Sequence, residues 1–386
     1  MRDVVVIGAG PAGLMAARTL AAAGHDVAVL EEHSQIGVPV HCTGLLGADA
    51  FDELPIPRDA ILTISHTARF VASDGTSVVV DAEHVRAAVV DRPVFDRALA
   101  DSTEAAGADV RAGARVRSIA VHPDRVVVTG DPGIAPITAR ACVLACGASY
   151  RFNRALGLGV PRVFIQSAQV EAPLEGPDNI EIHLARMIAP GGFAWLVPFR
   201  RGEQPHTRVG LMCQSSAAAR FAEFSAFVRG RFAAAGDWPK PRVKVLPLGP
   251  VERTFADRVV AVGDAAGLVK PTTGGGIYYS LISGQIAGEV LDGALRDDDL
   301  AKARLRTYET RWRERLGSEI RVGLAFRSLA SRLTDSAIDS LVDLARVDGL
   351  VPLLKQTADF NWHRRSALAL LRHAQFRKIV LGSLWG

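Results

Sequence analysis

The hydrophobic pattern at the start of the chain predicts two parallel strands joined by a helix. Val4–Ile7 is an unbroken apolar run, and Val27–Leu30 is a second one. Such runs are typical of strands that are buried on both faces of a parallel sheet. The Ala- and Leu-rich segment between them has the length of a helix and stops at Gly24. The chain is therefore expected to begin as a β–α–β unit of an α/β protein.

Three glycines follow the first predicted strand at the spacing G-x-G-x-x-G. They are Gly8, Gly10 and Gly13. Glycines at this spacing allow a tight turn, a close approach of the backbone to a pyrophosphate, and close packing of helix on strand. Glu31 follows the second strand about 20 residues on, where a carboxylate can accept a hydrogen bond from a ribose hydroxyl. The pattern predicts a dinucleotide site and does not choose between NAD and FAD. The alternative is a glycine-rich turn in an α/β core.

A second glycine cluster follows another short apolar run. Arg258–Ala261 has the pattern of a buried strand, and Gly263-Asp264 comes directly after it. Pro271–Ile277 then leads into a predicted helix that reaches about Leu291. An acid just past a strand, with a glycine cluster at a helix N-terminus, can hold a polyol chain and an electron-rich ring edge.

The middle of the chain alternates polar and apolar residues, which predicts further strands. Phe193 and Trp195 are two residues apart and should point to the same face of their strand. They form either plain core or the wall of an apolar substrate chamber. The predicted strands are residues 61–90 (several short strands with a turn at 73–75), 110–119, 125–129, 141–148 and 163–215, and the predicted helices are 92–107 and 217–234.

Composition narrows the function classes. The net charge of the 386-residue chain is only +4, so nothing points to a nucleic-acid partner. The four cysteines are too few for a disulfide framework and lack zinc spacing, so we expect a cytoplasmic protein without a metal site. No uncharged apolar run reaches the ~18 residues that a membrane span needs. The segment Asn361–Gly386 is basic and amphipathic, and it either packs on its own protein or lies on an anionic membrane surface.

The motifs together resemble the FAD-dependent superfamily that includes p-hydroxybenzoate hydroxylase. The resemblance rests on GAGPAG with Glu31, on the VGDAAG box, and on DRPVFD at 91–96. It implies that Asp264 binds the ribityl chain of FAD and that the Gly274–Ile277 backbone lies near the flavin pyrimidine edge. It also implies that Glu31 holds the adenosine ribose and that Arg92 lies beside the cofactor.

Three further stretches resemble the geranylgeranyl reductase branch, whose members saturate double bonds of prenyl chains. They are the P-x-x-C loop at Pro39–Cys42, the aromatic stretch GFAWLVP at 192–198, and VKPTTGGGI at 269–277. This resemblance implies a functional role for Cys42 and a prenyl channel lined by Phe193 and Trp195. The family often has tyrosine at the position of Phe193. The related hydroxylases carry Asp-Gly where this chain has Cys146-Gly147, which puts direct NADPH use in doubt.

These observations give one set of expectations. The fold is α/β, with a Rossmann-like FAD-binding domain (1–60, 81–162 and 251–295), an inserted antiparallel β-sheet substrate domain (61–80 and 163–250), and a helical C-terminal region (296–386). The substrate side is assigned to Phe193, Trp195 and Pro198. The expected cofactor-binding residues are Gly8, Gly10, Pro11, Ala12, Gly13, Glu31, Glu32, Cys42, Arg92, Gly147, Gly263, Asp264, Pro271, Gly274, Gly275, Gly276 and Ile277.

The expected activity is reduction of C=C bonds in polyprenyl groups by hydride from FAD, with a protein acid that protonates the other alkene carbon. Cys42 is the first candidate for that acid and His41 the second. The electron donor is NAD(P)H or a ferredoxin-like protein, and the oligomeric state stays open. Two other enzyme hypotheses are a monooxygenase acting on an aromatic or polyketide substrate and a reductase of a non-prenyl alkene. A non-catalytic flavoprotein is the rival from another class. A halogenase needs an early lysine, and the first lysine here is Lys240.

Overall fold

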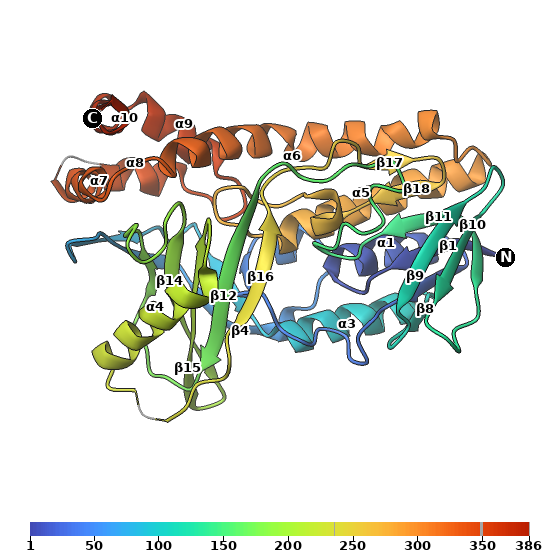
Figure 1. Ribbon diagram of the computed structural model, residues 1–386, viewed down its shortest axis with the longest axis horizontal. Helices are drawn as coiled ribbons and strands as arrows, with labels where there is room; N and C mark the ends of the chain where they lie inside the picture. The colour runs from blue at the N-terminus through green and yellow to red at the C-terminus, as the bar shows by residue number, and fades with distance from the viewer. Residues whose placement is uncertain (235, 348–349, 386) are drawn as a thin grey trace.

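The computed structural model describes residues 1–234, 236–347 and 350–385. Three residues of the predicted C-terminal region, 348, 349 and 386, therefore lie outside the described residues. Figure 1 shows two halves: a sheet flanked by α1, α3 and α5 on the right, and a second sheet backed by α4 on the left. Helix α6 (Lys302–Ala330) runs along the long axis and connects the two halves.

The first sheet has eight strands and contains the N-terminal strand at its centre. Its main path is β17-β18-β11-β1-β2-β8, and the hairpin β9–β10 pairs with β11. The pairs β1–β2, β1–β11, β11–β18 and β2–β8 are all parallel. Strands that are parallel end at the same edge, so the loops after β1, β11 and β18 meet there. The strands are β1 (Arg2–Ile7), β2 (Val27–Leu30), β8 (Asp109–Arg111), β9 (Val116–Val121), β10 (Val126–Gly130), β11 (Ile137–Leu144), β17 (Phe255–Ala256) and β18 (Val259–Ala261).

The second sheet has seven strands in the order β16-β12-β15-β14-β13-β5-β6. All of its pairs are antiparallel except β13–β5, which is parallel. A third, three-stranded sheet β3-β7-β4 lies at the junction between the halves. The strands are β3 (Leu45–Gly47), β4 (Ile61–Ser65), β5 (Thr67–Val71), β6 (Ser77–Asp81), β7 (Ala87–Val90), β12 (Phe164–Ala172), β13 (Ile180–His183), β14 (Phe193–Arg201), β15 (Gln204–Cys213) and β16 (Arg242–Pro247).

The helices confirm the α/β prediction and a helical C-terminal region. Helix α1 begins at Pro11, a residue whose fixed φ suits the first helical position. The side chain of Asp91 caps α3 by accepting a hydrogen bond from the Val94 amide. The helices are α1 (Pro11–Ala22), α2 (Ala50–Glu53), α3 (Arg92–Ala105), α4 (Ala217–Arg231), α5 (Ile277–Arg296), α6, α7 (Asp335–Val347), α8 (Leu350–Thr357), α9 (Arg364–Arg372) and α10 (Ala374–Trp385), with 3-10 turns at Arg58–Ala60 and Gly263–Ala266.

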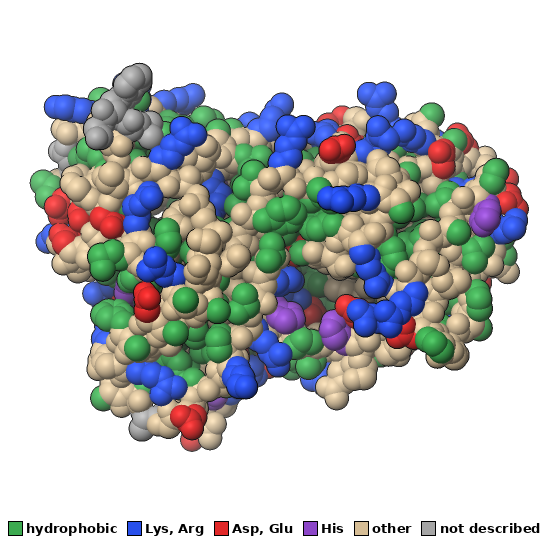
Figure 2. All heavy atoms as spheres, in the orientation of Figure 1, with side chains coloured by type: hydrophobic (Ala, Val, Ile, Leu, Met, Phe, Trp, Pro, Cys, Tyr) green, Lys and Arg blue, Asp and Glu red, His purple; other side chains and the backbone are tan. Residues whose placement is uncertain are grey.

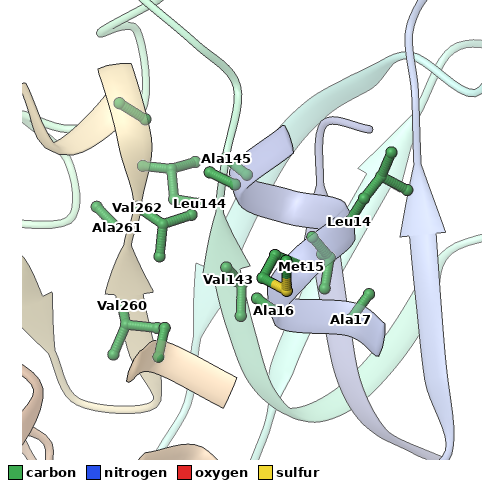
Figure 3. Packing of buried hydrophobic residues seen from close by; sticks show 14 of the residues in the cluster. Leu14, Met15, Ala16, Ala17, Val143, Leu144, Ala145, Val260, Ala261 and Val262 are labelled. Atoms are coloured by element: carbon green, nitrogen blue, oxygen red, sulfur yellow. The ribbon is translucent and has the colours of Figure 1, made fainter. Parts of the chain in front are cut away.

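Close packing of α1 on α5 fixes the helix layer over the parallel sheet. A Cβ on Gly284 of α5 would lie 2.2 Å from the Ala12 carbonyl oxygen, and one on Gly288 would lie 2.6 Å from Thr19 Cβ. Figure 3 shows α1 side chains beside Val143 of β11, with β18 next to that strand. The buried core is continuous through these three elements. The N-terminal end of α1 is therefore held at a fixed height above the sheet edge.

Two predicted stretches are divided differently in the structure. The stretch 110–119 is two strands, β8 and β9, because Gly113 adopts a positive φ of 73° and turns the chain between them. Strand β4 pairs with β7 in the small sheet, whereas β5 and β6 extend the seven-stranded sheet. Among the described residues, no helix combines the length and apolar composition needed to cross a membrane.

Candidate active site

A cavity of about 730 Å³ lies between the edge of the parallel sheet and the seven-stranded sheet. At one end its wall contains Gly10, Gly147 and Asp264, which follow β1, β11 and β18. The wall also includes apolar side chains of the seven-stranded sheet, among them Phe193 and Trp195 of β14. Figure 2 shows a recess in the middle of one face, rimmed by His and basic side chains. The volume is within the range of cofactor and ligand pockets.

The first glycine turn has the three properties that a dinucleotide phosphate requires. Gly8 has φ 106°, and a Cβ there would lie 2.4 Å from the Ala145 carbonyl oxygen. A Cβ on Gly13 would lie 2.1 Å from the Gly8 carbonyl oxygen. A Cβ on Gly10 would meet nothing within 4 Å, so Gly10 presents open backbone to the cavity. Because no side chain caps α1, its first amides remain available to an anion.

The second glycine turn lies against the first, since a Cβ on Gly263 would be 2.9 Å from Ala12 Cβ. Gly147 is open in the same way as Gly10, with nothing within 4 Å of its Cβ position. Asp264 lies in the wall, and its Oδ1 would be 2.9 Å from a Cβ on Gly276. The turn Gly274–Gly276 enters α5 without a side-chain cap. The open backbone of Gly10 and Gly147, together with the Asp264 carboxylate in the same wall, fits a flavin dinucleotide, which needs phosphate, polyol and ring-edge partners.

The P-x-x-C loop places both acid candidates in the cavity wall. His41 and Cys42 line it, and the Gly44 amide donates to Cys42 Sγ at 3.3 Å. The fully buried Arg208 guanidinium fixes the loop by donating to the Thr43 carbonyl at 2.5 Å and the Val90 carbonyl at 3.1 Å. Gly44 is required here, because a Cβ would lie 2.6 Å from Arg208 Nη1.

The electrostatic surroundings distinguish the two acid candidates. Burial, with help from Lys244 and other cations, lowers the pKa of His41, and its Nδ1 is buried without a hydrogen-bond partner among the described residues. His41 is therefore neutral near pH 7. Arg92 pairs with Asp96 at 2.8 Å and lies beside the Cys42 thiol. Burial alone would lower the pKa of Arg92, but Asp96 and Cys42 outweigh it and raise the pKa, so the guanidinium stays charged.

An aromatic wall faces the cysteine loop. The ring centroids of Phe193 and Trp195 lie 5.8 Å apart. Gln169 Oε1 accepts from Trp195 Nε1 at 3.2 Å and from Thr43 Oγ1 at 2.7 Å, so one carboxamide connects the wall to the loop. Pro198 is not part of the cavity wall, because strand alternation places it on the opposite face of β14 from Phe193 and Trp195. Pro198 therefore does not line this cavity together with Phe193 and Trp195.

The cavity wall brings together most, but not all, of the expected cofactor residues. Gly8, Gly13, Gly263 and Pro271 shape the turns without reaching the wall. Glu31 lies beside the first turn, where its Oε2 accepts from the Ala9 amide at 2.9 Å and its Oε1 accepts from His33. Glu32 is exposed and pairs with Arg115. The predicted site residues that line the wall are Gly10, Pro11, Ala12, His41, Cys42, Arg92, Gly147, Phe193, Trp195, Asp264, Gly274, Gly275, Gly276 and Ile277.

Several wall residues were not identified from the sequence. Lys270 lies inside the VKPTTGGGI motif, whose glycines, rather than its lysine, predict a cofactor site. Gln169 occupies a strand position next to apolar neighbours, and a polar residue at such a position is the one signal that the sequence offered. Arg327 of α6 donates to the carbonyls of Pro271 and Gly191, and helical periodicity gave no sign of this contact.

Comparisons with known proteins agree with this geometry. Residues 2–158 match the family described as pyridine nucleotide-disulphide oxidoreductase. The digeranylgeranylglycerophospholipid reductase 1 of Methanopyrus kandleri is 34% identical over 370 residues, which cover 92% of this chain and 96% of that protein. A geranylgeranyl bacteriochlorophyll reductase-like protein of Thermoplasma acidophilum superposes with a TM-score of 0.87 at 23% identity, covering 99% of both chains. A halogenase in complex with FAD has the same fold, with a TM-score of 0.71 at 15% identity over 100% of this chain and 91% of that one.

The two glycine turns, the cysteine loop and the aromatic wall thus occur in one cavity, and a relative that shares a third of the sequence covers nearly the whole chain. The chain belongs to the geranylgeranyl reductase family of FAD-dependent oxidoreductases.

Proposed function

We propose that this protein reduces carbon–carbon double bonds in the polyprenyl chains of a lipid, with FAD held in the described cavity. The observation that carries the proposal is the continuity of the cavity from the open backbone of Gly10 and Gly147 to the apolar wall at Phe193 and Trp195. The relatives named digeranylgeranylglycerophospholipid reductase support the substrate class.

The residues of the chain have distinct parts in this reaction. The first turn and the uncapped α1 bind the pyrophosphate, and Asp264 binds the ribityl chain. FAD, when bound, supplies the hydride, after reduction by NAD(P)H or a ferredoxin-like protein. The aromatic wall orients an extended apolar chain and excludes water. Cys42 Sγ holds the proton that reaches the second alkene carbon, because an isolated alkene accepts hydride poorly unless it is protonated at the same time.

Cys42 is preferred over His41 as the proton donor on chemical grounds. Since burial lowers the pKa of His41, the imidazole is neutral near pH 7, and the imidazolium form that would act as the acid is scarce. Cys42 lies in the wall, on a loop that Arg208 holds through the Thr43 carbonyl, and its thiol carries a proton that it can donate.

The test is anaerobic incubation of reduced enzyme with a prenyl phospholipid, followed by mass spectrometry of the lipid. Each reduced bond adds two mass units. Cys42→Ser should keep the FAD absorbance and lose at least about 100-fold in rate, in the usual range for removing a general acid. Cys146→Ser is the matched control, since burial raises the pKa of that thiol to about 12 and its Sγ faces the Ser149 carbonyl. A Cys42→Ser enzyme of wild-type rate would remove the assignment of the acid.

The alternative functions predict different outcomes in the same anaerobic incubation. A monooxygenase would consume O₂ with substrate and show no turnover anaerobically. A reductase of a non-prenyl alkene would leave every prenyl lipid unchanged, although its reduced flavin would still be reoxidised by its own substrate. A non-catalytic flavoprotein would bind FAD and transfer no hydride to any alkene.

We also propose that the C-terminal helices contact an anionic membrane surface from the cytoplasmic side. Helices α9 and α10 expose five basic residues together with Leu368 and Leu381. Cations and apolar side chains on one segment favour the interface of an anionic bilayer. Co-sedimentation should be strong with vesicles that contain anionic lipid and weak with zwitterionic vesicles. Equal binding to both would contradict an electrostatic contact. The exposed basic residues are Arg364, Arg365, Arg372, Arg377 and Lys378.

A further inference from the structure

Lys270 is a buried ammonium in the cavity wall. Lys270 comes shortly before the Gly274–Gly276 turn in the sequence, and its side chain is buried, with 5% of the residue exposed. Nζ donates to the Phe360 carbonyl at 2.7 Å and lies 4.4 Å from the centroid of the Phe360 ring. Within the described part of the chain, no carboxylate lies within 4.0 Å of this nitrogen. A buried charge without a counter-ion is costly, so it is expected where a ligand compensates for it.

The Lys270 side chain packs against the Gly274–Gly276 turn. A Cβ on Gly275 would lie 2.8 Å from Lys270 Cε and 3.5 Å from its Nζ, so the ammonium lies against this turn. The same turn opens α5, whose N-terminus has no side-chain cap and carries the positive end of the helix dipole. The Asp264 carboxylate lies at the other end of the turn, at Gly276, and pairs with Lys244 at 3.8 Å. Two sources of positive potential therefore converge at Gly275.

The titratable groups around Lys270 leave its ammonium charged near pH 7, and Arg92, Lys244 and Arg327 are further cations of the same wall. Burial lowers the pKa of Lys270 to about 8, while nearby acidic groups oppose the shift. Burial and the Lys270 charge lower the pKa of His363 to about 3, so this imidazole is neutral. Near pH 7 the ammonium is therefore still mostly protonated. The acidic groups that face it are Asp359, Asp49, Cys42 and Glu319.

We propose that Lys270 and the N-terminus of α5 stabilise the negative charge that the flavin ring system carries after reduction. Two electrons and one proton enter the ring from the donor, and one negative charge remains on the ring because the second proton stays in solvent. The inference rests on the proposed function, since it requires FAD with its pyrimidine edge at Gly274–Ile277. Lys270 is then a determinant of the reduction potential.

The experiment measures the midpoint potential of bound FAD by spectroelectrochemical titration between pH 5 and 7.5. Lys270→Met should lower the potential by at least about 30 mV, which is a tenfold weaker equilibrium for a two-electron couple. Lys270→Arg should keep most of the wild-type potential. Lys355→Met, the same chemical change on the exposed side of α8, is the control and should shift it little. A Lys270→Met protein with the wild-type potential would overturn the inference.

The pH dependence gives a second readout that needs no variant. A couple that takes up two protons changes by about 59 mV per pH unit, and one that takes up one proton by about 30 mV. The change from the two-proton to the one-proton slope should occur at lower pH in the wild-type protein than in free FAD. A change at the same or higher pH would refute the inference even if Lys270→Met failed to fold. Failure of the wild-type protein to bind FAD would instead refute the proposed function.

Discussion

Replacing Gly284 by alanine should damage both the stability of the protein and its affinity for FAD. The new Cβ would lie 2.2 Å from the Ala12 carbonyl oxygen, whereas ordinary contacts begin at 3.4 Å. The obstacle is backbone, so no side chain can rotate away, and α1 must move by roughly 1 Å. The displaced end of α1 carries Gly10, Pro11 and Ala12, which lie in the cavity wall.

The magnitude follows from two opposing terms. Overpacking of a buried site costs about 1–3 kcal/mol, and Gly→Ala in a helix gains about 1 kcal/mol. A contact with backbone belongs in the upper part of the first range, so we expect a net loss of about 1–2 kcal/mol. Gly293→Ala is the matched control on the same helix. Its Cβ would meet only the end of the Arg304 side chain, at 3.1 Å, so the propensity gain should remain.

The assay is urea unfolding of both variants, with and without FAD, together with a fluorescence titration of FAD binding. If binding has to reverse an α1 displacement that costs about 1.4 kcal/mol, the affinity for FAD falls tenfold. Gly293→Ala should unfold at higher urea than the wild type and bind FAD normally. The packing argument would be refuted by a Gly284→Ala protein as stable as Gly293→Ala, or by one that binds FAD like the wild type.

Two further predictions concern the seven-stranded sheet. Burial would raise the pKa of Glu181, but hydrogen bonds that include two from Arg231 lower it to about 2, so its stabilising effect is lost as the pH falls from 4.5 toward 2. Urea midpoints at pH 5 and pH 3 should differ more for the wild type than for Glu181→Gln, and equal differences would contradict the coupling. Gln169→Leu should disconnect Trp195 from Thr43 and leave a larger share of incompletely reduced lipid, whereas Gln169→Glu keeps the acceptor and should restore complete reduction; identical product distributions would exclude a positioning role.

The parts of the site that could be predicted from the sequence are those whose chemistry is local. The turn at Gly8–Gly13 follows from its own spacing, and the apolar runs around it have one reasonable interpretation. The same holds for Asp264 and the glycines that open α5. In each case the function depends on backbone conformation within a few residues, and glycine spacing records that conformation directly.

The parts that could not be predicted depend on contacts between distant segments. Lys270 meets the Phe360 carbonyl 90 residues later, and Gln169 meets Thr43 126 residues earlier. No periodicity along the chain encodes such pairs. Pro198 is a different case, because the alternation of β14 alone places it on the face opposite to Phe193 and Trp195. Strand β4 shows a third limit, since a short alternating run fits either of two neighbouring sheets.

Asn361 is completely buried, and its carboxamide donates to Asp49 Oδ1 at 2.7 Å across 312 residues of sequence. At a synthesis rate of about 5–20 residues per second, roughly 15 to 60 s separate the emergence of these two partners from the ribosome. During that interval the nascent polypeptide contains the phosphate turn, and from the synthesis of Lys270 onward it lacks the Phe360 carbonyl that accepts from that ammonium. An apolar cavity whose wall is incomplete exposes apolar surface, and we expect chaperones to bind it. A chain truncated before residue 360 would keep that surface exposed and would be recognised by protein quality control.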